Sequence, residues 1–182
     1  MTKRRCLRLV IVLAVSIAMA TSACSVEEVL PLPNCVDGES ALIVAQSVPT
    51  AEWIPCLESL PPGWEKTTVN VDEDGTVITF DSDRAGSNAA VVHYFETCEL
   101  GDSVQVSSEY PNAARFEFIE QVTPGFRATR RYVFEGGCLT WEFDFDDGAP
   151  SALSILLVDA FTLYSRADLN ENIRTSFIDA EL

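Results

Sequence analysis

Basic residues and histidine are scarce in this chain of 182 residues. Twelve Lys and Arg residues stand against 28 Asp and Glu residues, which gives a net charge of −16 at pH 7. So acidic a protein repels phosphate backbones and anionic lipid headgroups, which argues against nucleic-acid binding. The single histidine, His93, would have to serve any Ser-His-Asp or Cys-His arrangement. Because no G-x-S-x-G string surrounds a serine, nucleophilic hydrolysis is disfavoured.

Long apolar runs are missing beyond the N-terminus, where one short run occupies residues 9–20. Four basic residues precede it, and the small residues 21–23 lead into Cys24. This order is typical of an export signal, and the run is shorter than the ~20 residues that span a bilayer. The segment resembles the bacterial lipoprotein signal, in which a cysteine at the first mature position receives lipid. It departs from that pattern at Thr21, where leucine is usual, and ordinary secretion after Ala20 or Ala23 is the alternative.

The resemblance implies a signal peptide over residues 1–23 and lipid attachment at Cys24, which would anchor the protein to the outer side of the cell membrane. We expect a tether over residues 24–38 and a single domain over residues 39–182, since that length suits one hydrophobic core. Without residues 1–23, eight basic residues face 28 acidic ones, a net charge of −20. The simple interpretation of this charge is a solvated acidic surface. The more specific interpretation is a site for cations or for a basic partner.

The six cysteines support export. If Cys6 leaves with the signal and Cys24 carries lipid, an even set of four remains, which is what two disulfides need in an exported chain. Four cysteines allow three pairings, and we prefer the pairs that are near in sequence. A zinc site is disfavoured because the chain has no C-x-x-C spacing and no second histidine. No metal or other cofactor is expected. The preferred pairs are Cys35 with Cys56, and Cys98 with Cys138.

Alternation of apolar and polar residues predicts an antiparallel sheet of about five to six strands. The clearest strand covers residues 138–145, where Leu139, Trp141 and Phe143 point one way and Glu142 and Asp144 the other. A short helix is expected over residues 40–48, followed by a proline-rich loop to residue 64. The other predicted segments are two hairpins over residues 66–82 and 115–134, a strand over residues 89–97 and a short edge strand over residues 103–107.

The apolar sheet face needs a cover, and the C-terminal residues are expected to supply it. Residues 151–166 predict a nearly apolar helix, and a second helix is expected from Asp168, with Leu169, Ile173 and Phe177 facing inward. The predicted fold class is therefore α+β, with C-terminal helices on one sheet face, a short N-terminal helix and two disulfides.

Paired carboxylates are the main candidates for chemistry. Glu142 and Asp144 share a strand face about 7 Å apart, twice the ~3.4 Å strand rise, which is compatible with glycoside hydrolysis. An exposed acidic sheet face would show such pairs by chance. The Asp-Gly strings at residues 72–75 and 144–148 resemble calcium ligands, but Asp-Gly is also a common hairpin turn. Three arginines could bind an anion, although pairing with nearby acids is the simpler expectation: Arg84, Arg130 and Arg131.

Four strings are similar to an uncharacterised group of exported actinobacterial proteins. They occupy residues 45–49, 60–64, 81–86 and 136–145. The resemblance implies a cell-envelope protein and brings no activity with it. The leading hypothesis is a non-enzymatic binding or assembly domain outside the cytoplasmic membrane, and the alternative is a small envelope hydrolase acting on glycan through Glu142 and Asp144.

Overall fold

The structure, a computed structural model, describes residue 35 and residues 39–57 and 59–176. The expected signal peptide and Cys24 lie outside these residues, as do Phe177 and the side chain of Ile173. In the described part of the chain, no helix is long and apolar enough to cross a membrane.

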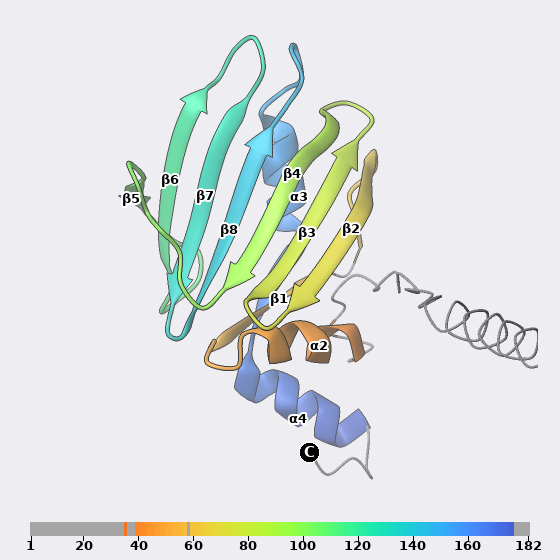
Figure 1. Cartoon of the computed structure of the whole chain (residues 1–182), viewed down its shortest axis with the longest axis vertical. Coiled ribbons are helices and arrows are strands. Elements are labelled where there is room, and N and C mark those ends of the chain that lie inside the picture. Colours follow the sequence, from red (N-terminus) through yellow and green to blue (C-terminus); the bar gives the residue numbers. More distant parts are fainter. Residues whose placement is uncertain (1–34, 36–38, 58, 177–182) are drawn as a thin grey trace, which may run out of the picture.

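The core of the molecule is a seven-stranded antiparallel sheet in the order β2-β3-β4-β8-β7-β6-β5 (Figure 1). This confirms the predicted antiparallel α+β architecture, with a larger main sheet than the five to six strands expected. Its strands lie where alternation predicted them. They are β2 (Trp64–Asp72), β3 (Gly75–Ser82), β4 (Gly86–Phe95), β5 (Val104–Val106), β6 (Ala114–Gln121), β7 (Arg127–Phe134) and β8 (Gly137–Asp144).

Strand β8 lies at the centre of this sheet, and its side chains alternate between the two faces. Leu139, Trp141 and Phe143 are buried on one side, as predicted, while Glu142 and Asp144 are exposed on the other. We call the side of Trp141 the inner face and the side of Glu142 the outer face. Inner-face residues of the neighbouring strands, such as Phe80 and Tyr94, join Trp141 in one hydrophobic core.

The inner face is covered by a mixed layer rather than by helices alone. It contains helix α3 (Ala152–Asp159) and a two-stranded antiparallel sheet of β1 (Trp53–Leu57) and β9 (Phe161–Ser165). Helix α2 (Glu39–Ser47) lies across the lower end in Figure 1, next to β1, β2 and β3. Phe161 of β9 connects this layer to the main sheet. Its ring packs edge-on against the rings of Trp141 and Phe80, with ring centroids 4.7 and 6.1 Å apart.

Two predictions for this layer were wrong. The expected helix over residues 151–166 ends at Asp159, and after Ala160 the residues Phe161–Ser165 form strand β9. The proline-rich loop contains strand β1, which pairs with β9 from Trp53↔Ser165 to Leu57↔Phe161. Pro55 fits because a two-stranded sheet has only edge strands, where a residue without an N–H is tolerated.

Helix α4 (Arg166–Ser176) begins two residues earlier than predicted. Ser165 accepts a hydrogen bond from the Asp168 backbone N–H at 3.0 Å and donates to the Asp168 carboxylate at 2.7 Å, which is a capping arrangement. Leu169 is buried, as expected. Arg166 ties this helix to the C-terminal end of α2, since its guanidinium donates to the carbonyls of Ala45 and Val48.

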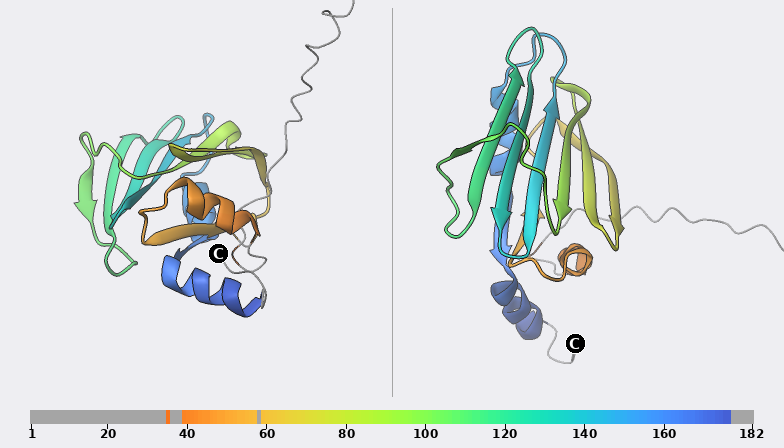
Figure 2. Two further views of the ribbon diagram at one scale, coloured as in Figure 1. Left: turned by 60° about the horizontal axis from the view of Figure 1, so that its bottom comes forward. Right: turned by 60° about the vertical axis from the view of Figure 1, so that its left-hand side comes forward.

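Both predicted disulfides are present: Cys35–Cys56 and Cys98–Cys138, with Cα atoms 5.5 and 5.8 Å apart. The second disulfide fixes the crossover, residues 96–103, which leads from the central strand β4 to the edge strand β5. This segment crosses the outer face in front of β8 and β7 (Figures 1 and 2), where Arg131 of β7 donates a hydrogen bond to Ser103. The crossover therefore covers one end of the outer face and leaves the other end open.

Candidate functional site

The open end of the outer face is hollowed, and the hollow contains both predicted carboxylates. We call it the outer hollow; its volume is about 260 Å³, and strands β4, β6, β7 and β8 line it. Glu142 and Asp144 both lie in it, as strand alternation predicted. The residues that line it are Asn88, Val91, Phe118, Glu120, Arg127, Ala128, Thr129, Glu142, Phe143 and Asp144.

Strand register places four of these side chains in one row across the sheet. Glu142 lies opposite Val91 of β4 on one side and opposite Thr129 of β7 on the other. Thr129 in turn lies opposite Phe118 of β6. Neighbouring side chains on one sheet face are about 5 Å apart, so Glu142 has Val91 on one side and Thr129, followed by Phe118, on the other.

Three carboxylates line the outer hollow, and the two on β8 differ in their surroundings. Asp144 accepts a hydrogen bond from Nε of Arg127 at 3.0 Å, and Nη1 of the same arginine lies 3.6 Å from Glu120. Glu142 lies 3.6 Å from Nε2 of His93, which is longer than a normal hydrogen bond. The side chains of Glu142 and Asp144 are 56% and 72% exposed. Asp144 is therefore paired with an arginine, whereas Glu142 has only the more distant His93 beside it.

His93 is the half-buried sheet histidine that the sequence predicted. It lies on the outer face of β4, its ring 5.6 Å from that of Phe95. Its Nε2 atom is shielded from solvent and makes no hydrogen bond within the described part of the protein. His93 therefore borders the outer hollow through Glu142.

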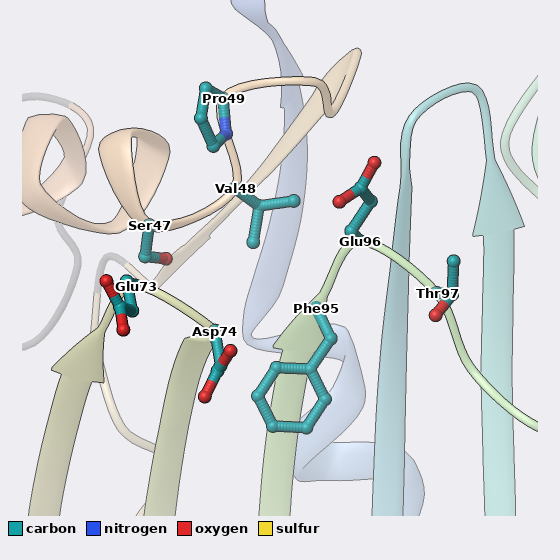
Figure 3. A pocket seen from close by; sticks show the side chains of 8 residues that line it. All are labelled: Ser47, Val48, Pro49, Glu73, Asp74, Phe95, Glu96 and Thr97. Carbon is teal, nitrogen blue, oxygen red and sulfur yellow. The ribbon is translucent and has the colours of Figure 1, made fainter.

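A second hollow, of about 380 Å³, lies where α2 ends above the β2–β3 turn (Figure 3). Its polar lining includes Glu73, Asp74 and Glu96, and Phe95 and Val48 supply apolar surface. The adjacent turn was one of the two calcium-like strings. Here the carboxylate of Asp72 accepts hydrogen bonds from the backbone N–H groups of Asp74 and Gly75, so it serves the turn. Within the described ranges, no three His, Cys, Asp or Glu residues are grouped so that they could hold a metal ion.

A charged network on the inner face was missed by sequence reasoning. Glu117 of β6 accepts hydrogen bonds from Arg115 on the same strand and from Nε of Arg130 on β7 at 2.7 Å. Arg115 also reaches Glu109, which accepts from the Tyr132 hydroxyl at 2.6 Å. The sequence signal was the alternation of Arg115 with Glu117, whose faces could not be assigned before the register was known.

The network shifts the pKa values of its members. Burial would raise the pKa of Glu117, but the hydrogen bond from Arg115 and the charge of Arg130 outweigh it, so that pKa is lowered. The pKa of Glu109 is lowered as well, because hydrogen bonds from Tyr132 and Arg115 outweigh burial. Burial and the hydrogen bond to Glu109 raise the pKa of Tyr132. Each carboxylate is thus held in its charged form, which suits a structural role.

The three arginines considered for anion binding are all engaged within the molecule. Arg84 lies 3.7 Å from Asp83, and Arg130 binds Glu117. Arg131 donates to the Ser103 hydroxyl of the crossover.

Comparison with known proteins finds no match for this chain, whether among protein-family models, curated proteins or solved structures.

Proposed function

We propose that this chain is an extracytoplasmic binding domain, anchored to the outer side of the cell membrane by lipid on Cys24. The observation that carries the proposal is the asymmetry of the main sheet. Its inner face carries the hydrophobic core and the charged network around Glu117, whereas its outer face keeps one open, hollowed end beside the crossover. A rigid sheet of seven strands supports side chains at this open end more precisely than a loop would.

The two disulfides support an exported location, because disulfides persist in oxidising compartments and are rare in the cytosol. The likeness to actinobacterial exported proteins and the charged, apolar and small-residue order before Cys24 support the same proposal. Lipid at that cysteine would hold an acidic domain close to a bilayer that its charge repels.

The anchoring is tested by replacing Cys24 with serine and fractionating cells that express the full chain. The wild type is expected in the membrane fraction, and the Cys24→Ser protein is expected in the medium or as an uncleaved precursor. The matched change Cys6→Ser, within the expected signal, should leave fractionation unaltered. Membrane retention of a correctly cleaved Cys24→Ser protein would refute lipid anchoring.

Binding is tested by cross-linking the tagged protein in intact cells and identifying what co-purifies by mass spectrometry. A reproducible envelope partner, cross-linked through the open end of the outer face, is the expected result. Cross-links confined to the covered inner layer would contradict the proposed surface.

A glycan hydrolase is the second candidate, because the outer hollow brings Glu142 and Asp144 together. A general acid needs a carboxyl group that stays protonated, usually through burial. Both side chains are more than half exposed, and Asp144 is paired with Arg127, so the geometry favours binding over catalysis. The double change Glu142→Gln, Asp144→Asn would abolish release of sugars from cell-wall glycan if the protein were a hydrolase. A binding domain releases no sugar from that glycan, with or without the change.

A further inference from the structure

We propose that the outer hollow binds a basic, partly apolar segment of a protein partner, and that Glu142 receives the positive charge. This inference rests on the proposed binding function and names the chemistry of its partner. It follows from the charge balance of the hollow, from the apolar side chains beside Glu142 and from the overall charge of the molecule.

The charge balance of the hollow is negative. Three carboxylates line it, on Glu120, Glu142 and Asp144, against the one guanidinium of Arg127. Arg127 is already shared between Asp144 at 3.0 Å and Glu120 at 3.6 Å. It is therefore poorly placed to receive an anionic ligand, and the hollow as a whole favours a cation.

Glu142 is the carboxylate with capacity left. The basic side chain paired with it in the described structure is His93, whose Nε2 lies 3.6 Å away and makes no hydrogen bond there. A carboxylate accepts several hydrogen bonds, and a guanidinium or ammonium group arriving from solvent could supply them. Such charge-assisted bonds are stronger than neutral ones.

The apolar neighbours of Glu142 suit a long basic side chain rather than a small free cation. Val91 lies opposite Glu142, and Phe118 lies one strand further on, beyond Thr129, with 38% of its surface exposed. Arginine and lysine bury their aliphatic stems on such surface while the charged end reaches a carboxylate. The face of Phe118 can also attract a cation directly. A small hydrated ion would use none of this apolar surface.

The charge of the whole molecule points to a partner protein of opposite sign. At −16, or −20 without the expected signal, the chain repels a second copy of itself and attracts basic proteins over a Debye length. Complementary charge of this kind raises association rates and rejects like-charged partners. The occupant is therefore a segment of a different, basic protein.

The test measures binding of fluorescent peptides to the detergent-purified full chain by fluorescence anisotropy. The probe is a ten-residue peptide in which arginine alternates with valine, and its matched control replaces each arginine with neutral citrulline. The arginine peptide should bind, more weakly as salt rises, and the citrulline peptide should not. Glu142→Gln should weaken binding about tenfold, which corresponds to about 1.4 kcal/mol. Glu171→Gln removes the same charge from an exposed position on α4 and should leave binding unchanged.

Three results would overturn the inference. The first is equal loss in Glu142→Gln and Glu171→Gln, which would mean diffuse attraction to an acidic surface. The second is equal affinity for the citrulline peptide, and the third is no binding of the arginine peptide. The cross-linking experiment in cells separates these failures from failure of the proposed function. A partner captured at the outer face would support the proposed binding function. If that partner had no basic segment, the further inference alone would be refuted.

Discussion

At the scale of single residues, Glu117 shows how this acidic protein keeps charge inside its inner layer. Its side chain is 23% exposed and accepts hydrogen bonds from both Arg115 and Arg130. Leaving two partly buried guanidinium groups without their carboxylate costs more than losing an exposed ion pair. Glu117 therefore stabilises the β6–β7 end of the sheet, on the face opposite the outer hollow.

Glu117→Gln is expected to lower the free energy of unfolding at pH 7 by about 1–3 kcal/mol, the cost of unmatched hydrogen bonds to charged groups. Because the pKa of Glu117 is lower in the folded protein, its stabilisation is complete above the unfolded pKa and is lost as pH falls through the folded one. The gap between wild type and variant should shrink from pH 7 to about pH 3. Urea unfolding across this range measures it, with the exposed Glu65→Gln as control. A gap that stays constant with pH would contradict the assignment.

Prediction from sequence succeeded for single residues where the position of a residue along its strand determines which sheet face its side chain occupies. In β8 the alternation of Trp141 with Glu142 identified the buried and exposed faces, because successive strand residues point to opposite sides. It did not identify the acidic partner of Arg130, which is Glu117 on the neighbouring strand. Strand register determines which residues face each other on neighbouring strands. Register depends on turn geometry and packing, which a local sequence pattern does not specify.

At the scale of elements, the crossover determines which end of the outer face stays open. It is fixed to β8 by Cys98–Cys138 and touches β7 through Ser103 and Arg131. Cys138 is fully buried although it lies on the outer face. The crossover therefore covers the outer face next to its open end.

The double change Cys98→Ser, Cys138→Ser is expected to lower the free energy of unfolding by about 3–4 kcal/mol, from the loop entropy of a 40-residue separation. Hydrogen exchange should quicken in the crossover, residues 96–103, more than in the central strands. Ser103→Ala, which removes only the contact with Arg131, serves as the mild control. Unchanged exchange in the crossover would mean that other contacts hold it.

Element prediction failed at β9 for an identifiable reason. Residues 151–166 are nearly all apolar, so no period separates helix from strand. Strand β9 exists because β1 pairs with it, and the two are about a hundred residues apart in sequence. Tertiary pairing thus decided between two local structures, whereas the hairpins, whose strands are adjacent in the chain, were predicted correctly.

At the scale of the whole molecule, the excess of acidic residues opposes compaction. Six contacts between arginine and a carboxylate are found among the described residues, but each joins one charge of either sign and leaves the net charge of −16 unchanged. Mutual repulsion destabilises a compact state of high net charge, and salt screens it.

The midpoint of urea unfolding is therefore expected to rise as NaCl increases from 10 to about 200 mM, at which concentration the Debye length is shorter than 10 Å. Sucrose in place of NaCl serves as a control, because it stabilises without screening charge. A midpoint that falls with NaCl would show that the ion pairs outweigh the repulsion.

If the domain is tethered through lipid on Cys24, as proposed, the Cys35–Cys56 disulfide also has a mechanical consequence. A pull applied before Cys35 passes through the sulfur bridge directly to Cys56 in β1. The loop between the two cysteines, which contains α2, carries no tension, because the bridge is the shorter covalent path. Drag or cell-wall movement acting on a tethered domain would load the β1–β9 pair first and leave α2 folded at the lower end of the sheet.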